Sequence, residues 1–274
     1  MPITTLDGAI AGMRPPMPII KTGIATAAVG AMRGYTPWYA PGNPGASTAT
    51  AIGVNGEAVT PALGSVGGRI PRVNPSAGLN AYLGRLAMQA SQAGTMWLID
   101  RMWQNSGLSV TSAVGQPITS AALPARDNNG TANGAGVMAA IEWSATGGAG
   151  TPTVTLNYND QDNNAGTGTF TAVASPPVGT FEIFTLGAGD TGIRSLTSAT
   201  SFTQSATRTS GTQHLVLFRV LAQIDVTAAN IGNAVDALTS GFPRLFDDTV
   251  LQLVWFPSVT TATNFVGQYI ETQG

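Results

Sequence analysis

Cysteine is absent from this chain of 274 residues, and charged side chains are scarce. Without cysteine there is no disulfide framework and no thiolate metal site. Charged residues make up 9% of the sequence, whereas an ordinary soluble domain carries about 25%. A free monomer of this size needs charge spread over its surface to resist self-association. The sequence therefore predicts that other subunits cover much of the surface.

Long apolar runs and basic clusters are also missing. No stretch approaches the about 18 consecutive apolar residues of a membrane-spanning helix. The first residues lack the basic and apolar regions of a signal peptide, so we expect an unprocessed N-terminus. Lys21 is the only lysine and the arginines are dispersed, so no basic stripe is present to neutralise phosphates. We expect no membrane role and no direct contact with nucleic acid.

Proline and glycine interrupt residues 1–75, most densely at 14–18, 37–45 and 64–71. Both residue types weaken helices and central strands, so this segment is predicted to be an extended, irregular N-terminal arm. It carries more apolar and aromatic side chains than a solvated linker usually has. We expect the arm to lie across a neighbouring subunit, while a self-packed irregular subdomain and a disordered segment remain alternatives. The predicted contact residues are Ile19, Ile20, Tyr35, Trp38 and Tyr39.

Residues 76–135 are predicted to form one substantial α-helix and a connecting loop. Asn74 and Pro75 suit a helix start, and no further proline follows for some forty residues. Gly84 and Gly94 would weaken this helix, so they indicate either close backbone packing or a break into two shorter helices. The apolar residues that recur at roughly helical spacing are Leu79, Leu83, Leu86, Ala90, Ala93, Trp97 and Met102.

Residues 136–274 contain short β-type runs separated by turn clusters. With no helices alternating between them, these runs predict a mainly β chain with an antiparallel sandwich or barrel, for which a jelly-roll-like sandwich is the best single topology. The one exception is 227–238, which we interpret as a short helix in a loop. The nine predicted strands are 137–144, 153–158, 167–174, 180–186, 193–196, 201–208, 214–226, 249–256 and 264–270.

Few residues are able to carry chemistry. His214 is the only histidine, and no G-x-S-x-G elbow presents a serine to it, so we favour a structural or surface histidine over a catalytic triad. Two carboxylates suffice for glycoside hydrolysis, but nothing in their spacing selects a pair. We predict no catalytic residue, no cofactor and no small-molecule substrate. A glycosidase that uses Glu142 or Glu182 ranks third among the possible functions.

The segment Asn159–Asn164 is rich in oxygen ligands of the kind that calcium prefers. Asp160 and Asp162 are the weak candidates for metal ligands. The segment departs from the EF-hand pattern, because Ala165 stands where that pattern has glycine and Thr171 where it has glutamate. We favour a solvated hairpin loop without an ion, since Asp and Asn suit turns by themselves.

Five segments of the chain carry a resemblance to known proteins: residues 83–86, 90–95, 98–107, 251–255 and 269–274. They resemble segments of structural proteins of tailed-bacteriophage particles, and the best-fitting family is the head decoration, or cement, proteins. That resemblance implies a homotrimer clamped over contacts between subunits of the major capsid protein, on the outer surface of the phage head, after synthesis in the host cytoplasm. It supplies no catalytic residue.

The expected function is therefore that of a non-enzymatic viral structural protein, which stabilises a capsid by removing apolar and amide-rich surface from water. A neck or tail component of the same particle would show the same composition. The alternative is a carbohydrate- or receptor-binding module of a phage tail fibre or an adhesin. In that alternative, Trp143 or the loop Asn159–Asn164 would contact sugar.

Overall fold

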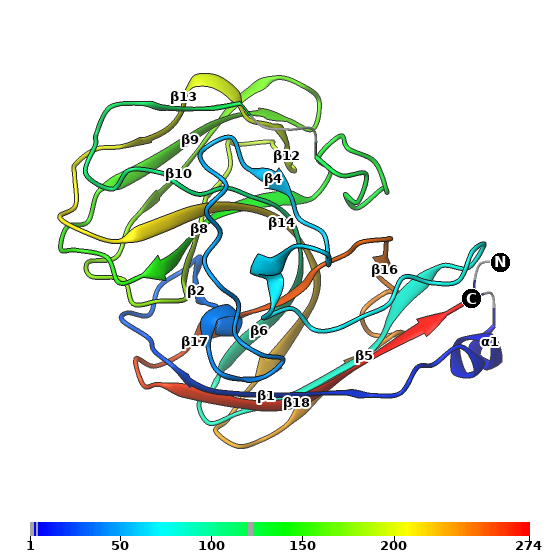
Figure 1. The fold of residues 1–274 in the computed structure, drawn as a ribbon. Helices are drawn as coiled ribbons and strands as arrows, with labels where there is room; N and C mark the ends of the chain where they lie inside the picture. Colours follow the sequence, from blue (N-terminus) through cyan, green and yellow to red (C-terminus); the bar gives the residue numbers. More distant parts are fainter. Residues whose placement is uncertain (1–2, 4, 120–122) are drawn as a thin grey trace.

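The computed structural model describes residues 3, 5–119 and 123–274. Within this part the chain is mainly β, with antiparallel strand pairs throughout (Figure 1). This confirms the predicted mainly β, antiparallel class. The helical segments are short: α1 (Leu6–Ala11) and the 3-10 turns η1 (Pro37–Tyr39) and η2 (Gly64–Val66).

Six strands close into a barrel. They are hydrogen-bonded in the order β14, β8, β11, β2, β17 and β6, and β6 pairs again with β14. Closure removes the free edges that an open sheet would leave. The short strand β4 adds to β6 outside the ring. The bounds are β2 Arg33–Tyr35, β4 Glu57–Ala58, β6 Gly94–Gln104, β8 Val137–Ala145, β11 Thr180–Ile183, β14 Thr212–Val226 and β17 Leu251–Pro257.

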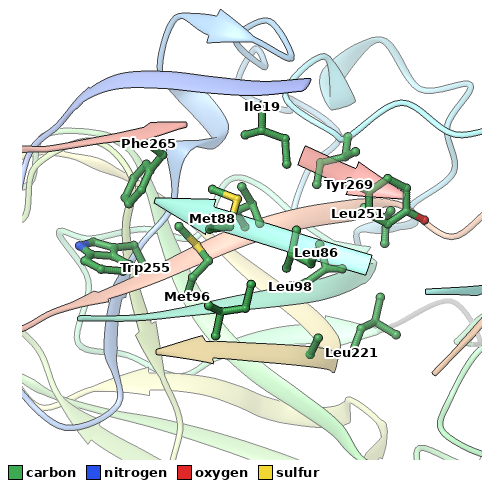
Figure 2. Packing of buried hydrophobic residues seen from close by; sticks show 14 of the residues in the cluster. Ile19, Leu86, Met88, Met96, Leu98, Leu221, Leu251, Trp255, Phe265 and Tyr269 are labelled. Atoms are coloured by element: carbon green, nitrogen blue, oxygen red, sulfur yellow. The ribbon is translucent and has the colours of Figure 1, made fainter. Parts of the chain in front are cut away.

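A second sheet, called sheet A, packs on one side of the barrel. Its strand order is β15, β5, β18, β1 and β3, with β16 beside β5. Figure 2 shows its buried side chains, such as Leu86, Met88 and Phe265, against those of the barrel strands, such as Met96, Leu98 and Trp255. The bounds are β1 Met17–Ile24, β3 Gly42–Asn43, β5 Ala81–Ala90, β15 Asn233–Asp236, β16 Arg244–Leu245 and β18 Thr263–Gln273.

A third sheet, called sheet C, packs on the barrel through a separate core. Its order is β10, β9, β13 and β7, with β12 beside β9. Leu156 and Phe202 of this sheet share a core with Ile141, Trp143 and Leu217 of the barrel. In Figure 1 sheet C lies at the top and sheet A at the bottom, with barrel strands between them. The bounds are β7 Gln116–Thr119, β9 Thr153–Asp160, β10 Ala165–Thr171, β12 Ile193–Ser195 and β13 Thr197–Gln204.

The helix predicted after Pro75 is wrong, because these residues form β5 and β6, which lie in two different sheets. The register of β5 against β18 shifts by one residue at Gly84. Such a bulge breaks the two-residue alternation, so Leu83 and Leu86 are both buried although they are three residues apart. The bulge thus produces an apolar spacing that resembles that of a helix.

Strand β6 lacks alternation for a different reason. From Leu98 to Gln104 every residue is buried, because one face points into the barrel and the other packs outside it. A strand that is buried on both faces shows no two-residue alternation, so its sequence pattern does not distinguish strand from helix. A Cβ at Gly94 would lie 2.4 Å from the Phe256 carbonyl oxygen. The glycine therefore marks close backbone packing, which was one of the two interpretations open from the sequence.

The short helix predicted over 227–238 is also wrong. Asn230 has a positive φ of 61°, which a right-handed helix does not allow. The segment instead turns back and adds β15 to β5 as an edge strand. By contrast, each of the nine strands predicted beyond residue 136 is present, with ends shifted by at most four residues.

Residues 1–75, predicted as an arm, contribute strands to two of the sheets. β1 pairs along its length with β18 in sheet A, and β2 lies between β11 and β17 in the barrel. At these positions the segment packs on its own chain. The jelly-roll topology and an arm that reaches another subunit stay predictions.

Candidate functional site

Three of the five predicted contact residues are buried inside the chain itself. Ile19 and Tyr35 are 0% exposed, and Trp38 is 2% exposed. The Tyr35 hydroxyl donates to the Ala28 carbonyl oxygen at 2.8 Å, and the Arg101 guanidinium lies over the Trp38 ring. The apolar surface of these three residues therefore stabilises the fold, and they cannot contact a partner.

The other two predicted contact residues differ from each other. Tyr39 is half-buried, and its hydroxyl donates to Glu142 Oε2 at 2.8 Å. Burial, together with the nearby Glu142 carboxylate, raises the pKa of Tyr39 well above its usual value. Ile20 is 48% exposed on β1. Of the five residues, only Ile20 presents a large apolar surface to the outside.

A fully buried ion pair with amide partners lies at one end of the barrel interior. Arg101 Nη1 donates to both Glu142 carboxylate oxygens, at 2.9 and 2.8 Å, and to Gln252 Oε1 at 3.1 Å. Gln252 Nε2 in turn donates to Glu142 Oε1 at 2.8 Å. These side chains come from β6, β8 and β17, so the cluster links three barrel strands. Arg101 Nε also donates to Gln104 Oε1 at 2.9 Å, and such further hydrogen bonds offset the cost of burying a charge pair.

His214 is buried and hydrogen-bonded through both ring nitrogens. Its Nδ1 lies 2.9 Å from the Asn105 carbonyl oxygen, which can only accept, so Nδ1 carries the proton. Nε2 then accepts from the Ser144 hydroxyl at 2.6 Å. Burial lowers the pKa of His214 and favours this neutral form. The contacts join β14 to β8 and to the segment after β6.

Glu142 and Glu182, the residues of the glycosidase alternative, point to opposite sides of the barrel wall. In the register of β8 against β11, Glu182 pairs with Ile141 and therefore faces away from Glu142. Glu182 accepts from the Val173 amide at 2.7 Å, and burial raises its pKa. A glycosidase needs both carboxyl groups beside one bond. These two residues therefore do not form a glycosidase pair.

Two of the sugar-contact residues of the carbohydrate-binding alternative, Trp143 and Asp160, make contacts within the fold. Trp143 is buried beneath the Arg208 guanidinium, 5.0 Å from the ring centroid. In the β9–β10 loop, Asp160 Oδ1 accepts from the amides of Asp162 and Asn164 at 2.8 Å each. This arrangement is a hydrogen-bonded turn, as favoured from the sequence.

Among the residues that the structure describes, no three His, Asp or Glu side chains gather as a metal ion would require. Over the same residues, no helix has both the length and the apolar character needed to cross a bilayer.

Many of the few charged side chains are buried. Eleven of them are buried, whereas eight are exposed, and the eight consist of six aspartates and two arginines. The buried ones are Lys21, Asp100, Arg101, Arg126, Asp127, Glu142, Asp160, Glu182, Arg208, Arg219 and Glu271. The exposed ones are Asp7, Arg85, Asp162, Asp225, Asp236, Arg244, Asp247 and Asp248. The exterior is thus even poorer in charge than the composition indicates.

One candidate interaction surface is the outer face of sheet A, which points away from the barrel. Ile20 and Val266 are opposite each other in the β1–β18 register, and both are about half exposed. Arg85 and Asp236, also opposite each other, are the charged residues of this face on β15, β5, β18 and β1, and exposed Arg244 of β16 lies at its end, opposite Tyr82. A signal for it was present in the sequence, because β18 carries apolar residues on both of its faces. The members are Pro18, Ile20, Arg85, Ala87, Gln89, Ala234, Asp236, Val266, Gln268 and Ile270.

Comparisons with protein-family models, with curated proteins and with solved structures found no match to this chain.

Proposed function

We propose that this chain is a non-enzymatic structural protein of a bacteriophage particle, which decorates the capsid and stabilises it by clamping neighbouring capsid subunits. One observation carries the proposal. Only eight exposed and seven partly exposed charged residues lie on an accessible surface of 10561 Å², whereas a soluble domain needs about a quarter of its surface residues charged. Such an exterior suits a protein that is surrounded by other subunits.

The resemblance to head decoration proteins supplies the type of particle. The proposal accordingly includes a homotrimer, a place on the outer surface of the phage head, and the major capsid protein as partner. It keeps the jelly-roll-like sandwich, for which the packing of sheets A and C on the barrel is the supporting observation. Each 100 Å² of apolar surface that the particle covers would contribute about 2.5 kcal/mol, before the entropy of ordering is subtracted.

The test is to purify the particle made by the genome that encodes this chain. Mass spectrometry should detect the chain in stoichiometric amounts, and cryo-electron microscopy should place it on the outside of the head. Heads lacking the chain should disassemble at a lower temperature, and added chain should restore them. Absence from purified particles would overturn the proposal. Binding on a glycan array, with no binding to heads, would support the carbohydrate-binding alternative instead.

A further inference from the structure

The outer face of sheet A carries both a hollow and the side chains that could fill it. The hollow has a volume of about 530 Å³ and lies over β15, β5 and β18, where Ala87, Ala234 and Gly232 leave room. Beside it, Ile20 and Val266 protrude from β1 and β18, 48% and 55% exposed. Polar side chains such as Gln89 and Gln268 line the hollow together with the small residues. A surface that holds an apolar protrusion and a hollow side by side can be complementary to itself.

Charge on this face also permits self-pairing. On the four strands β15, β5, β18 and β1, the guanidinium of Arg85 is balanced by the carboxylate of Asp236 directly opposite it. Arg244 of β16 lies at the end of the face, away from Ile20 and Val266. A second copy placed over these four strands therefore meets the apolar protrusion and the hollow without a net charge of the same sign.

We propose that two copies of this chain associate through the outer faces of their A sheets, around a two-fold axis that runs along the strands between β18 and β5. Ile20 and Val266 of each copy then enter the hollow over β5 and β15 of the other. The inference rests on the proposed function in one respect only: both require that the surface of the chain binds other subunits. A trimer in the particle would use a different surface.

The size of the face fits a weak but specific contact. Strands β5, β18 and β1, about 4.8 Å apart and counted over about eight residues at 3.3 Å each, present about 450 Å² per copy together with the four residues of β15. Two copies thus cover about 900 Å² in total, which is in the size range of weak, transient contacts. We expect a dissociation constant in the micromolar range, because small interfaces leave little surplus over the entropy of association.

Pairing by faces is also favoured because the edges of sheet A are poorly suited to strand addition. β15, at one edge, is only four residues long. At the other edge Pro18 lacks an amide hydrogen, and two-residue β3 covers Ile20 and Lys21. Short edge strands and proline are devices by which proteins prevent edge pairing.

The first experiment measures association of the purified full chain by sedimentation velocity from 1 to 200 µM. The wild type should shift from monomer to dimer over this range. Val266→Glu should weaken the dimer at least tenfold without changing the melting temperature, because the side chain is exposed. Val114→Glu is the matched control, since Val114 is 75% exposed away from sheet A. A wild type that stays monomeric at 200 µM, or a dimer that Val266→Glu leaves intact, overturns the proposal.

A second experiment tests the two-fold geometry in trans. Ala87→Lys should also abolish the dimer, because it places a charge in the hollow. A mixture of the Val266→Glu and Ala87→Lys chains should form a heterodimer, in which one mismatched contact becomes a carboxylate–ammonium pair and the other is wild type. A mixture that remains monomeric contradicts protrusion-into-hollow pairing. Association that is lost only on substitution of Leu6 or Ile10 in α1 also contradicts it, because the interface would then lie at α1.

The two proposals fail separately. A chain that dimerises through sheet A but is absent from particles refutes the capsid role alone. A chain that is present in particles but is monomeric, or trimeric through another surface, refutes the sheet A pairing alone.

Discussion

Lys21 shows at the scale of one residue how this chain uses a charged group inside. Its side chain is 1% exposed, and Nζ donates to the carbonyl oxygens of Ala40 and Gly45 at 2.9 and 2.8 Å. No carboxylate is among these partners. Burial lowers the pKa of Lys21 to about 8, and the neutral amine still has the two hydrogens that the two carbonyls need.

The free energy of unfolding should therefore rise as the pH increases from 7.5 to 9.5. In this window the unfolded lysine, with a pKa of about 10.4, still holds its proton while the folded lysine has lost it. Denaturant titrations of the wild type and of Lys21→Met check this. The variant should be less stable throughout, because two carbonyls lose their donors, and it should lack the rise. An identical rise in the variant would assign the effect to other groups.

His214 should produce a pH effect on the acid side. Its folded pKa is lowered by burial, so below about pH 6.5 the unfolded state takes up the proton first. Stability contributed by the neutral ring is complete above that pH and is lost as the pH falls. His214→Gln should remove part of the difference in unfolding free energy between pH 7.5 and 5.5. An unchanged difference would contradict the neutral buried imidazole.

The Arg101–Glu142 pair can be tested by removing one partner and then both. Arg101→Met leaves a buried carboxylate uncompensated and should cost about 3–5 kcal/mol of unfolding free energy. Arg101→Met combined with Glu142→Leu should recover much of this loss, because no unpaired charge then remains. A double variant as unstable as the single one would show that the amide partners, such as Gln252, depend on both charges.

At the scale of elements, the sequence identified strands by alternation and missed them where alternation fails. The strands beyond residue 136 include half-buried ones such as Thr153–Asp160, in which buried and partly exposed residues alternate. β5 carries a bulge, and β6 is buried on both faces, so both gave a helix-like pattern. The strands before residue 75 are short or rich in proline, and their pairing partners are distant in sequence. Local pattern alone contains no signal for such pairing.

For the candidate site residues, the sequence likewise predicted those roles that residue type alone determines and missed those that depend on the fold. Proline-flanked aromatic residues such as Trp38 were taken as contact residues, but a rigid aromatic side chain suits a core as well as an interface. The turn role of Asp160 and the absence of a catalytic motif around His214 could be read from residue types. The outer face of sheet A required the pairing of β1 with β18, which only the fold provides.

Substitution of Gly84 in β5 and Gly94 in β6 by alanine distinguishes strand from helix by the sign of the change in stability. In a helix, Gly→Ala would stabilise by about 1 kcal/mol. In this fold Gly94→Ala should destabilise by about 1–3 kcal/mol, because its Cβ would overlap the Phe256 carbonyl and the Trp255 ring. Gly84→Ala should cost less, since the nearest atom to its added Cβ would be the Ile270 carbonyl oxygen at 3.2 Å. Melting temperatures of the two variants check the order, and a stabilising Gly94→Ala would refute the strand.

At the scale of the whole molecule, scarce exterior charge should make self-association nearly independent of salt. Salt screens charge–charge interactions but not apolar contacts. Between 50 and 500 mM sodium chloride, we expect the dissociation constant of the wild-type chain to change less than about threefold, since the four paired strands carry only Arg85 and Asp236 as charged residues of that face. Sedimentation at the two salt concentrations checks this, and a strong weakening by salt would indicate contacts between charged surfaces instead.

The barrel also constrains when the protein can fold. Its ring includes β2 (Arg33–Tyr35) between β11 and β17, so the last link forms only with Leu251–Pro257. A nascent chain therefore emerges from the ribosome with unpaired strand edges until Leu251–Pro257 has been synthesised. Such edges invite wrong pairing between neighbouring chains, and the timing of translation becomes a determinant of how much native protein a cell obtains.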